Sequence, residues 1–357
     1  MKRLQILDDD GNLIAPDLEP KIGKKELKRA LETMIQVRLL DEKGIRLQRQ
    51  GKVTFHIFTK GQEAHVAAAV ALQDEDWVYP AYREHGIALY RGFSLEDLVN
   101  HLFANVKDKE KGRRLPGLFG SKKHNFVNPS APIGTQIIQA AGTAYAMKLK
   151  GEPNVTAVFF GDGATSSNDF HSGLNFGGVT KSPVIFVCQN NQWAISVPFE
   201  KQTAAKQIVD RAPGYGIEGI QIDGNDFLAF YTAIQQARER ALRGEGPTLI
   251  ESITYRVTPH TSSDDPKVYR SEDEVKQWEK KDPIKRFKNY LINKGVIKEA
   301  DYEKMVNSTS ELLDKLIDEA EKLPKPSLST LFDDVFEEIP PFLQEEKEEL
   351  LNFYKEA

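Results

Sequence analysis

The chain has 357 residues, 40% of them hydrophobic, and a formal net charge of −5, which allows one large or two modest domains with a sizeable core. No basic excess points to nucleic acid or an anionic membrane surface as a partner, and no apolar run reaches the roughly 18 residues of a membrane span. The N-terminal stretch lacks an apolar signal core and is too acidic for a transit peptide. The single cysteine, Cys188, lies in an apolar run, which favours a reducing compartment, and the cytoplasm is the simplest expectation.

The first part of the chain predicts an N-terminal arm followed by helices. Residues 1–23 carry turn signals and no clear periodicity, so an extended arm is expected there. Helical spacing of apolar residues, or a run of small residues, predicts helices over 24–50, 63–72, 95–104 and 137–148.

The middle of the chain alternates strand and helix patterns. Short apolar runs predict buried strands at 155–160, 184–188, 217–223 and 248–257. An amphipathic helix is expected at 227–242 and another between the first two strands. This alternation predicts an α/β fold with a doubly wound, mostly parallel sheet flanked by helices.

A long polar loop and a helical tail follow the last predicted strand. The loop, 259–270, is too long for a simple connection, so it is expected to be functional or mobile. Ser271 and Glu274 form a capping box that begins a charge-rich helical region. We therefore expect an arm and helix (1–50), a ligand-binding α/β domain (51–270), and a helical C-terminal region (271–357) packed on the same domain.

Two polar motifs stand directly after the first two predicted strands. Gly-Asp-Gly follows the first and places Asp162 at its end, and Asn-Asn follows the second and places Asn191 there. Parallel strands joined by a helix end at the same edge of a sheet, so these side chains are expected to lie together. Carboxylate, amide and backbone carbonyl oxygens suit Mg2+, and a chelated diphosphate would complete the octahedron. Gly-Asp-Gly alone also makes ordinary turns, but the pair of motifs is typical of thiamine diphosphate enzymes.

From about residue 30 to 345, the chain resembles the alpha subunit of thiamine-diphosphate-dependent 2-oxo acid dehydrogenases, the first, decarboxylating component of multienzyme complexes. The motifs that carry the resemblance are AYREHG (81–86), SAPIGTQ (130–136), GDGATS (161–166), NNQWAIS (190–196), PGYGI (213–217), IDGND (222–226) and PHTSSDDPKVYRS (259–271). The branched-chain type is closest, through RAPGYGI, HTSSDDPKVYRS and DEVKQW.

The resemblance implies roles for individual residues, each with a simpler structural alternative. The expected magnesium ligands are Asp162, Asn191 and the carbonyl of Trp193. The expected cofactor contacts are Asp162, Asn191, Tyr82, Arg83, Ala131, Ile133, Gly163, Ala164, Gln189 and His260. A potassium-binding turn is matched by Ser130, Pro132, Thr135 and Gln136, and the 2-oxo acid pocket by Phe55 and Tyr82. His260 is the expected catalytic residue, acting on protons near the reacting carbon.

Several of these residues allow a plainer interpretation. His260 taken alone would be a solvated loop histidine, and a Tyr82–Arg83 pair would be a half-buried tyrosine beside a surface salt bridge. Some relatives carry arginine in place of Gln189, so one charged contact to the diphosphate is in question. The charged residues that follow His260 either order the loop through salt bridges or form a solvated charge run; they are Asp264, Asp265, Tyr269 and Arg270.

The resemblance implies oxidative decarboxylation of a branched-chain 2-oxo acid with reductive acylation of a lipoyl domain. The implied cofactors are thiamine diphosphate and Mg2+, with K+ as a further candidate. Thiamine diphosphate also needs a carboxylate against its aminopyrimidine, and the sequence offers no second sheet domain to supply one. A beta subunit in an α2β2 heterotetramer and a lipoyl-bearing acyltransferase are therefore the expected partners. A pyruvate or acetoin dehydrogenase alpha subunit, and a non-catalytic Mg–diphosphate-binding assembly subunit, remain alternatives.

Overall fold

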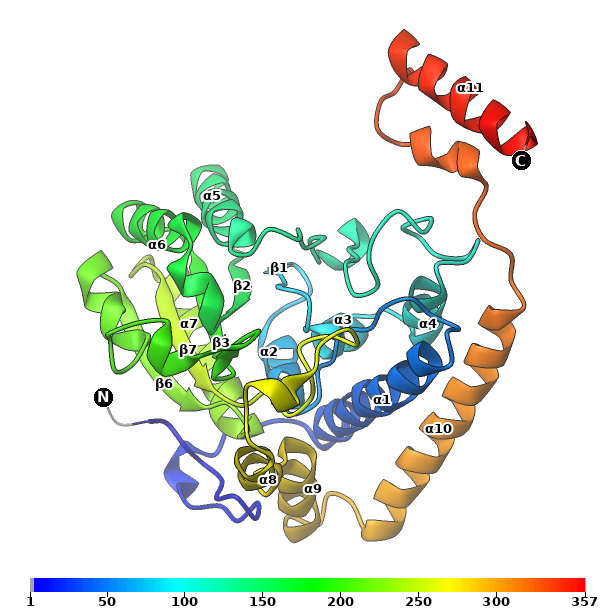
Figure 1. Ribbon diagram of the computed structural model, residues 1–357. Helices are drawn as coiled ribbons and strands as arrows, with labels where there is room; N and C mark the ends of the chain where they lie inside the picture. Colours follow the sequence, from blue (N-terminus) through cyan, green and yellow to red (C-terminus); the bar gives the residue numbers. More distant parts are fainter. Residues whose placement is uncertain (1–2, 357) are drawn as a thin grey trace.

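Five parallel strands form the central sheet of the computed structural model, which describes residues 3–356 (Figure 1). Their order in the sheet is β1-β2-β3-β7-β6. The strands are β1 (Trp77–Tyr79), β2 (Thr156–Gly161), β3 (Val184–Asn190), β6 (Glu218–Asp223) and β7 (Thr248–Ile253). A small antiparallel pair, β4 (Trp193–Ala194) and β5 (Val197–Pro198), follows β3. The expected mostly parallel α/β sheet is confirmed, although the strand predicted over 248–257 ends at Ile253.

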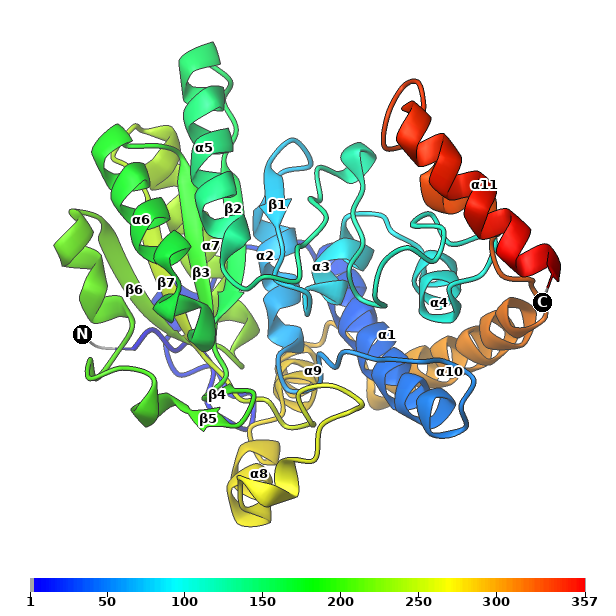
Figure 2. The same cartoon turned by 45° about the horizontal axis from the view of Figure 1, so that its top comes forward.

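Helices cover both faces of this sheet (Figure 2). The α-helices are α1 (Lys24–Arg49), α2 (Val66–Ala71), α3 (His85–Tyr90), α4 (Leu95–Phe103), α5 (Thr135–Lys150), α6 (Asn168–Thr180), α7 (Phe227–Leu242), α8 (Glu272–Glu279), α9 (Pro283–Asn293), α10 (Glu299–Glu321) and α11 (Pro341–Glu356). Helices α5 and α6 pack together on one face, and α7, with α2 beside it, covers the other. The strands therefore belong to two hydrophobic cores.

The two cores follow the alternation of side chains along each strand. In β2, Ala157 and Phe159 join the core shared with α1, α2 and α7, whereas Val158 and Phe160 join the core beneath α5 and α6. This alternation is the two-residue period of a strand. Because both faces of the sheet are buried, the sequences of β2 and β3 are nearly continuous apolar runs and do not alternate between apolar and polar residues.

The unit β2–α6–β3 brings two chain segments to one edge of the sheet. In the register of β2 and β3, Gly161 lies opposite Gln189, so the residues that follow each strand emerge side by side. A 3-10 turn, η4 (Asp162–Ser166), then leads into α6, whose N-cap is Ser167. The Ser167 Oγ accepts a hydrogen bond from the Phe170 N–H at 3.2 Å, which is an ordinary helix start.

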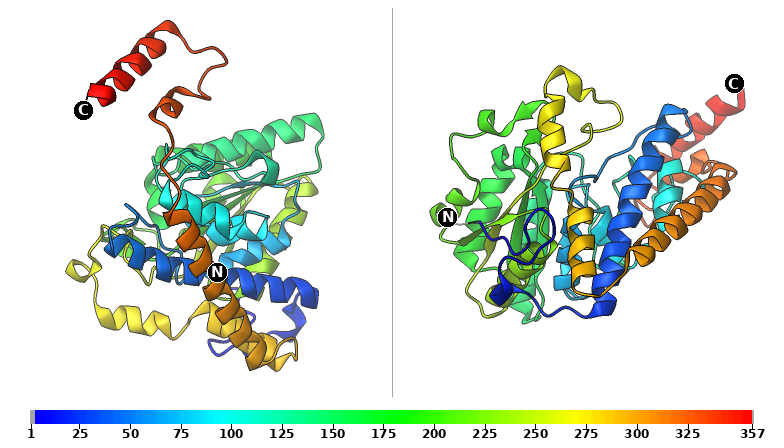
Figure 3. Two further views of the ribbon diagram at one scale, coloured as in Figure 1. Left: turned by 90° about the vertical axis from the view of Figure 1, so that its right-hand side faces the viewer. Right: turned by 90° about the horizontal axis from the view of Figure 1, so that it is seen from below.

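The N-terminal arm and the C-terminal helix α11 lie on opposite sides of the molecule (Figure 1). In the N-terminal arm, the backbone N–H groups of Ile6 and Leu7 donate to the carboxylate of Asp226 at 2.6 and 2.7 Å. Helices α1, α9 and α10 form a helical layer beside the sheet (Figure 3). The last helix, α11, packs on the short helix η8 (Leu328–Phe332) and stands away from the sheet. Over residues 3–356, no helix combines the length and the apolar character needed to cross a bilayer.

Candidate active site

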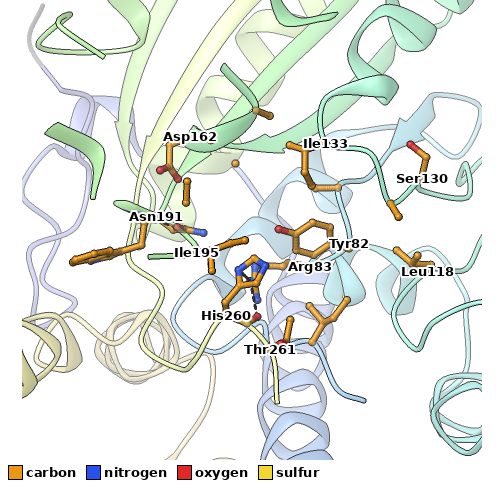
Figure 4. A pocket seen from close by; sticks show the side chains of 18 of the residues that line it. Tyr82, Arg83, Leu118, Ser130, Ile133, Asp162, Asn191, Ile195, His260 and Thr261 are labelled. Carbon is orange, nitrogen blue, oxygen red and sulfur yellow. Dashed lines mark hydrogen bonds between the residues drawn. The ribbon is translucent and has the colours of Figure 1, made fainter. Parts of the chain in front are cut away.

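A cavity of about 480 Å³ lies at the edge of the sheet where β2 and β3 end (Figure 4). Thirteen of the predicted site residues line it: Phe55, Tyr82, Arg83, Ser130, Ala131, Ile133, Gln136, Asp162, Gly163, Ala164, Asn191, Trp193 and His260. They come from segments spread over some 200 residues of sequence. The fold therefore gathers most of the predicted site into one hollow.

Asp162 is the buried acid of this cavity. It is the first residue after β2, and it is only 1% exposed. Gln202 donates to its Oδ2 at 2.5 Å. Burial raises the pKa of Asp162, while hydrogen bonds from Gln202 and from the backbone N–H of Asn191 lower it. Within residues 3–356 no cationic group lies at ion-pair distance from this carboxylate, so the charge has no fixed partner.

Asn191 enters the cavity from the end of β3 and is held by two contacts. Its Oδ1 accepts from the backbone N–H of Trp193 at 3.3 Å, and its Nδ2 donates to Gln62 at 3.4 Å. The turn that follows places Gln192 at φ 74° and Ile195 at φ 54°. Left-handed backbone is costly for a β-branched residue such as Ile195, and such conformations cluster at functional sites.

Close approach of two segments explains the glycine at position 163. A Cβ at Gly163 would lie 2.8 Å from the Cβ of Ala194, so any side chain there would push the turn after β2 away from the small pair β4–β5. The glycine thus allows Asp162 and the Trp193 turn to share one corner of the cavity.

Two buried arginines supply positive charge at the same cavity. Arg83 is 4% and Arg256 0% exposed, and within the described part of the chain neither has a carboxylate at ion-pair distance. Arg256 donates to the carbonyls of Trp193 at 3.2 Å and Ile195 at 2.6 Å. Burial lowers the pKa of Arg256 to about 10.

His260 lies between these two guanidinium groups. Its Nδ1 is 3.2 Å from Arg83 Nη2 and 3.4 Å from Arg256 Nη1. Burial lowers the pKa of His260 to about 3, and the positive charges of Arg83 and Arg256 act in the same direction. A guanidinium can only donate, so Nδ1 must accept and the proton of the neutral ring must sit on Nε2. His260 is therefore a neutral N–H donor in this state.

The loop that carries His260 is ordered by its own charged side chains. Asp264 accepts from the backbone N–H of His260 at 2.7 Å and from the hydroxyl of Tyr269 at 2.5 Å. Arg270 donates to the carbonyls of Val257 at 2.7 Å and Thr258 at 2.9 Å, and to that of Arg256. The loop is thus ordered, but by hydrogen bonds instead of the predicted salt bridges, since within residues 3–356 Asp264, Asp265 and Arg270 form no ion pair. Asp265 stands apart from these hydrogen bonds and accepts only from the N–H of Lys267.

Three predicted residues lie outside the cavity lining. Gln189 is buried within β3 and its amide donates to the carboxylate of Glu84, so it faces away from the hollow. Pro132 and Thr135 sit behind Ser130, whose hydroxyl lies 3.3 Å from the Pro132 carbonyl; the Thr135 hydroxyl lies 3.1 Å from the same oxygen. These oxygens form a small polar turn at the start of α5.

Other residues in or beside the cavity were not predicted from the sequence; Arg256 and Gln202 lie beside it and contact residues that line it. Arg256 follows β7, and because β7 pairs in parallel with β3, its position at the same sheet edge was a signal that could have been read. Gln202 lies in an irregular segment, and no pattern in the sequence marks it as a partner of Asp162. The remaining unpredicted residues extend the apolar wall; among them are Ile57, Leu115, Leu118 and Ile195.

The charges of the cavity fit a magnesium-bound diphosphate. A buried charge is costly unless it is paired or binds an ion. Here Asp162 and Arg83 line one hollow and Arg256 lies beside it, and within residues 3–356 all three are buried without an ion-pair partner. A cation beside the carboxylate and an anion beside the guanidinium groups would neutralise both. The fold and this charge distribution define an α/β protein whose cavity combines a buried acid with buried cationic side chains.

Comparison with known proteins agrees with this class. A family model described as "Dehydrogenase E1 component" matches residues 31–329, and the chain belongs to this family, as its motifs indicate. The chain is 40% identical over 354 residues to the mitochondrial 2-oxoisovalerate dehydrogenase subunit alpha of Dictyostelium discoideum (98% of this chain, 80% of the relative). It is 38% identical over 348 residues to the human protein of that name (97% and 78%). It is also 42% identical over 355 residues to the pyruvate dehydrogenase E1 component subunit alpha of Staphylococcus epidermidis (99% and 92%).

Proposed function

We propose that this protein is the alpha subunit of a branched-chain 2-oxo acid dehydrogenase, an oxidoreductase that uses thiamine diphosphate and Mg2+. The observation that carries the proposal is a set of buried charges without an ion-pair partner in the described part of the chain: Asp162 and Arg83 line the cavity, and Arg256 lies beside it against His260. Membership in the E1 family supports thiamine diphosphate as the ligand.

The chain's own residues would hold the two ends of the metal–diphosphate group. Asp162, Asn191 and the carbonyl of Trp193 would bind Mg2+ through oxygen, its preferred ligand. Arg83 and the Nε2–H of His260 would bind the diphosphate, since charge-assisted hydrogen bonds to phosphate are strong. Thiamine diphosphate, when bound, supplies the nucleophilic carbon and the electron sink for decarboxylation.

The remaining lining residues would give the cavity its shape and exclude water from it. Ile133 is 51% exposed and projects into the hollow. This position suits a side chain that would pack against the bound cofactor. His260 is placed to donate, or after protonation to deliver, a proton near the reacting carbon. Bringing an anionic diphosphate beside His260 would raise the pKa of its imidazole, so the bound state is the one in which proton transfer becomes accessible.

The chain supplies only part of an active site. Asp162 is the only acidic residue that lines the cavity in the described part of the chain, and it is committed to the metal. The carboxylate required at the aminopyrimidine must then come from another polypeptide, a beta subunit in an α2β2 heterotetramer. A lipoyl-bearing acyltransferase would accept the acyl group.

The C-terminal tail supports docking of a partner. Four exposed aromatic side chains lie on η8–α11 and the turn between them, namely Phe336, Phe342, Phe353 and Tyr354, each at least 50% exposed. Exposed aromatic groups clustered on one segment are typical of protein interfaces. The tail is therefore a candidate contact with the beta subunit.

The apolar wall supports a branched aliphatic substrate. Phe55, Ile57, Leu115 and Leu118 line one side of the cavity, and each buried methylene of a substrate gains roughly 0.8 kcal/mol. Pyruvate is the second candidate, because the bacterial relative at 42% identity is named for it. Reconstitution with the beta subunit, followed by rates on 3-methyl-2-oxobutanoate and pyruvate with a dye acceptor, decides between them; a higher kcat/KM on pyruvate would overturn the branched-chain assignment.

Two controls complete this experiment. The alpha chain alone should show no turnover, and robust activity without a partner would defeat the half-site proposal. His260→Ala should lower partner-dependent turnover by about 100-fold, whereas unchanged turnover would favour a non-catalytic assembly subunit.

A potassium ion in the turn before α5 is a further part of the proposal. The hydroxyls of Ser130 and Thr135 lie 3.3 and 3.1 Å from the carbonyl oxygen of Pro132, which provides several oxygen ligands in one turn. Replacing K+ by Na+ should lower the melting temperature of the reconstituted enzyme. Equal melting temperatures in the two salts would remove this site.

A further inference from the structure

A buried carboxylate on α1 is the least expected polar group near the cavity. Asp41 lies inside this long helix and is 2% exposed. Aspartate is a poor residue for a helix interior, and burying a carboxylate is costly unless its oxygens are hydrogen-bonded. The helix alone therefore does not explain why a buried aspartate stands at position 41.

All three hydrogen bonds of Asp41 go to one irregular segment, residues 56–60. Its Oδ1 lies 3.0 Å from His56 Nε2, and its Oδ2 accepts from the backbone N–H groups of Thr59 at 2.6 Å and Lys60 at 2.8 Å. One turn further along α1, Gly44 leaves room for the imidazole, since a Cβ there would lie 2.8 Å from the His56 ring. This face of α1 is thus shaped to hold the segment.

The same segment holds Arg83. The carbonyl of Phe58 accepts from the Arg83 guanidinium, and the Thr59 hydroxyl donates to the Arg83 carbonyl at 2.9 Å. Arg83 in turn donates to the carbonyl of His260 at 2.9 Å. Segment 56–60 therefore holds Arg83 through hydrogen bonds to both its backbone carbonyl and its guanidinium group.

The segment also holds the loop that bears His260. The backbone N–H of His56 donates to the Ser262 hydroxyl, and the His56 carbonyl accepts from the Ser262 N–H, both at 3.1 Å. Ile57 forms an isolated antiparallel bridge with Thr261. No regular secondary structure runs through residues 55–60 or 258–264 apart from this bridge, so these contacts are what fixes their relative position.

We propose that Asp41 is a positioning residue: through segment 56–60 it sets the placement of Arg83 and of the His260 loop for binding of the diphosphate group. This inference rests on the proposed function, because it assigns the two positioned side chains to thiamine diphosphate. Asp41 itself does not line the cavity.

The chain contains a matched control for this role. Asp108 is also buried and also accepts from one imidazole and two backbone N–H groups: His101 Nδ1 at 3.0 Å, Glu110 at 3.0 Å and Gly112 at 2.9 Å. Its hydrogen bonds make no link to Arg83 or to the His260 loop. Loss of Asp108 should therefore cost stability of the same kind without moving the cationic side of the cavity.

The experiment compares Asp41→Ala, Asp108→Ala and Asp41→Asn in the reconstituted α2β2 enzyme. Asp41→Ala should raise the KM for thiamine diphosphate about tenfold. The fold-decrease in kcat at saturating cofactor should be smaller than this increase in KM. In hydrogen exchange without cofactor, it should also increase exchange of the backbone amides of 81–84 and 258–264. Asp108→Ala should leave both readouts within twofold of wild type. Asp41→Asn keeps an acceptor for two amides and should restore most of the affinity.

The outcomes separate the two claims. If wild-type α2β2 does not bind thiamine diphosphate, the proposed function fails; if it binds and the two alanine variants shift cofactor KM and exchange equally, the positioning role fails. Should Asp41→Ala not fold, the double variant Thr59→Val with Ser262→Ala decides, because it removes two links while keeping Asp41. A KM for cofactor unchanged in that variant overturns the proposal.

Discussion

The two sides of the cavity are built in different ways. On the metal side, Asp162 and Asn191 follow adjacent parallel strands, and the register of β2 and β3 places them together. On the cationic side, Arg83 and His260 come from irregular segments separated by 177 residues of sequence. Strand pairing fixes the first side, and side-chain hydrogen bonds across the fold fix the second.

The metal side and the cationic side of the cavity owe their rigidity to different interactions. A ladder of backbone hydrogen bonds in a doubly buried sheet tolerates many side-chain changes at its ends. The cationic side depends on a few buried polar groups, such as Asp41 and Arg270, each of which satisfies several backbone groups at once. Loss of one such group leaves several buried partners unsatisfied, so this side should be the more fragile of the two.

The largest expected effect is on the metal side. Asp162→Asn removes the carboxylate proposed to bind Mg2+, and cofactor-dependent turnover of the reconstituted enzyme should fall by about 1,000-fold. In the absence of cofactor, the same change should raise the free energy of unfolding by about 1 kcal/mol, because an unpaired buried charge is removed. Chemical denaturation and turnover assays measure the two quantities, and a loss of both stability and activity would contradict this account of Asp162.

A smaller effect is expected when the cationic side is altered. Arg83→Lys keeps the charge but cannot reach the Phe58 and His260 carbonyls together. The affinity for thiamine diphosphate should fall about 30-fold, and exchange of the 258–264 amides should rise. Isothermal titration and hydrogen exchange test this; wild-type protection of that loop in the variant would show that Arg83 does not hold it.

Acid should destabilise the fold through three histidines, of which His260 lies on the cationic side of the cavity. The pKa values of His65, His85 and His260 are lowered to about 4, 3 and 3, in each case chiefly by burial. In the unfolded chain these groups bind protons below about pH 6.5, whereas the folded state excludes them, so stability is complete above pH 6.5 and falls as the pH drops towards 4.

The variant His85→Asn isolates one of these groups. Between pH 6.5 and 5, its free energy of unfolding should decline less steeply than that of wild type, by about 1.4 kcal/mol per pH unit. Denaturant melts at a series of pH values give this slope. Parallel slopes for the two proteins would mean that His85 is protonated in the folded state.

The smallest effect is expected at Gln189. Gln189→Arg introduces the arginine found in some relatives, but the residue faces the buried Glu84 rather than the cavity. The new guanidinium should pair with Glu84, whose pKa is raised by burial, and cofactor affinity should change by less than about threefold. A tenfold gain in affinity would show that this position reaches the diphosphate.

These differences explain how much the sequence could predict. Apolar runs and the motifs at their ends were sufficient for four of the five strands and for Asp162 and Asn191, because connections between parallel strands follow general rules; the three-residue strand β1 was not predicted. The family resemblance supplied Arg83 and His260. Asp41 and Gln202 were missed because their roles depend on contacts between segments far apart in the chain, and a single sequence carries no periodic signal for such contacts. Arg256 was missed although its place after β7 was a readable signal.

Gln189 illustrates the opposite error. The family resemblance suggested a cofactor contact for Gln189, which lies near the end of β3, two residues before Asn191. The structure turns Gln189 towards Glu84 instead. A single sequence carries no signal for this contact, because Gln189 and Glu84 are 105 residues apart in the chain.

The most direct test of the central claim is a crystal structure of the α2β2 enzyme with thiamine diphosphate and Mn2+ in place of Mg2+. The account predicts an anomalous peak within about 2.2 Å of the carboxylate of Asp162 and the amide oxygen of Asn191, with the diphosphate beside Arg83 and His260. A metal bound elsewhere, or a diphosphate that does not touch this edge of the sheet, would contradict it.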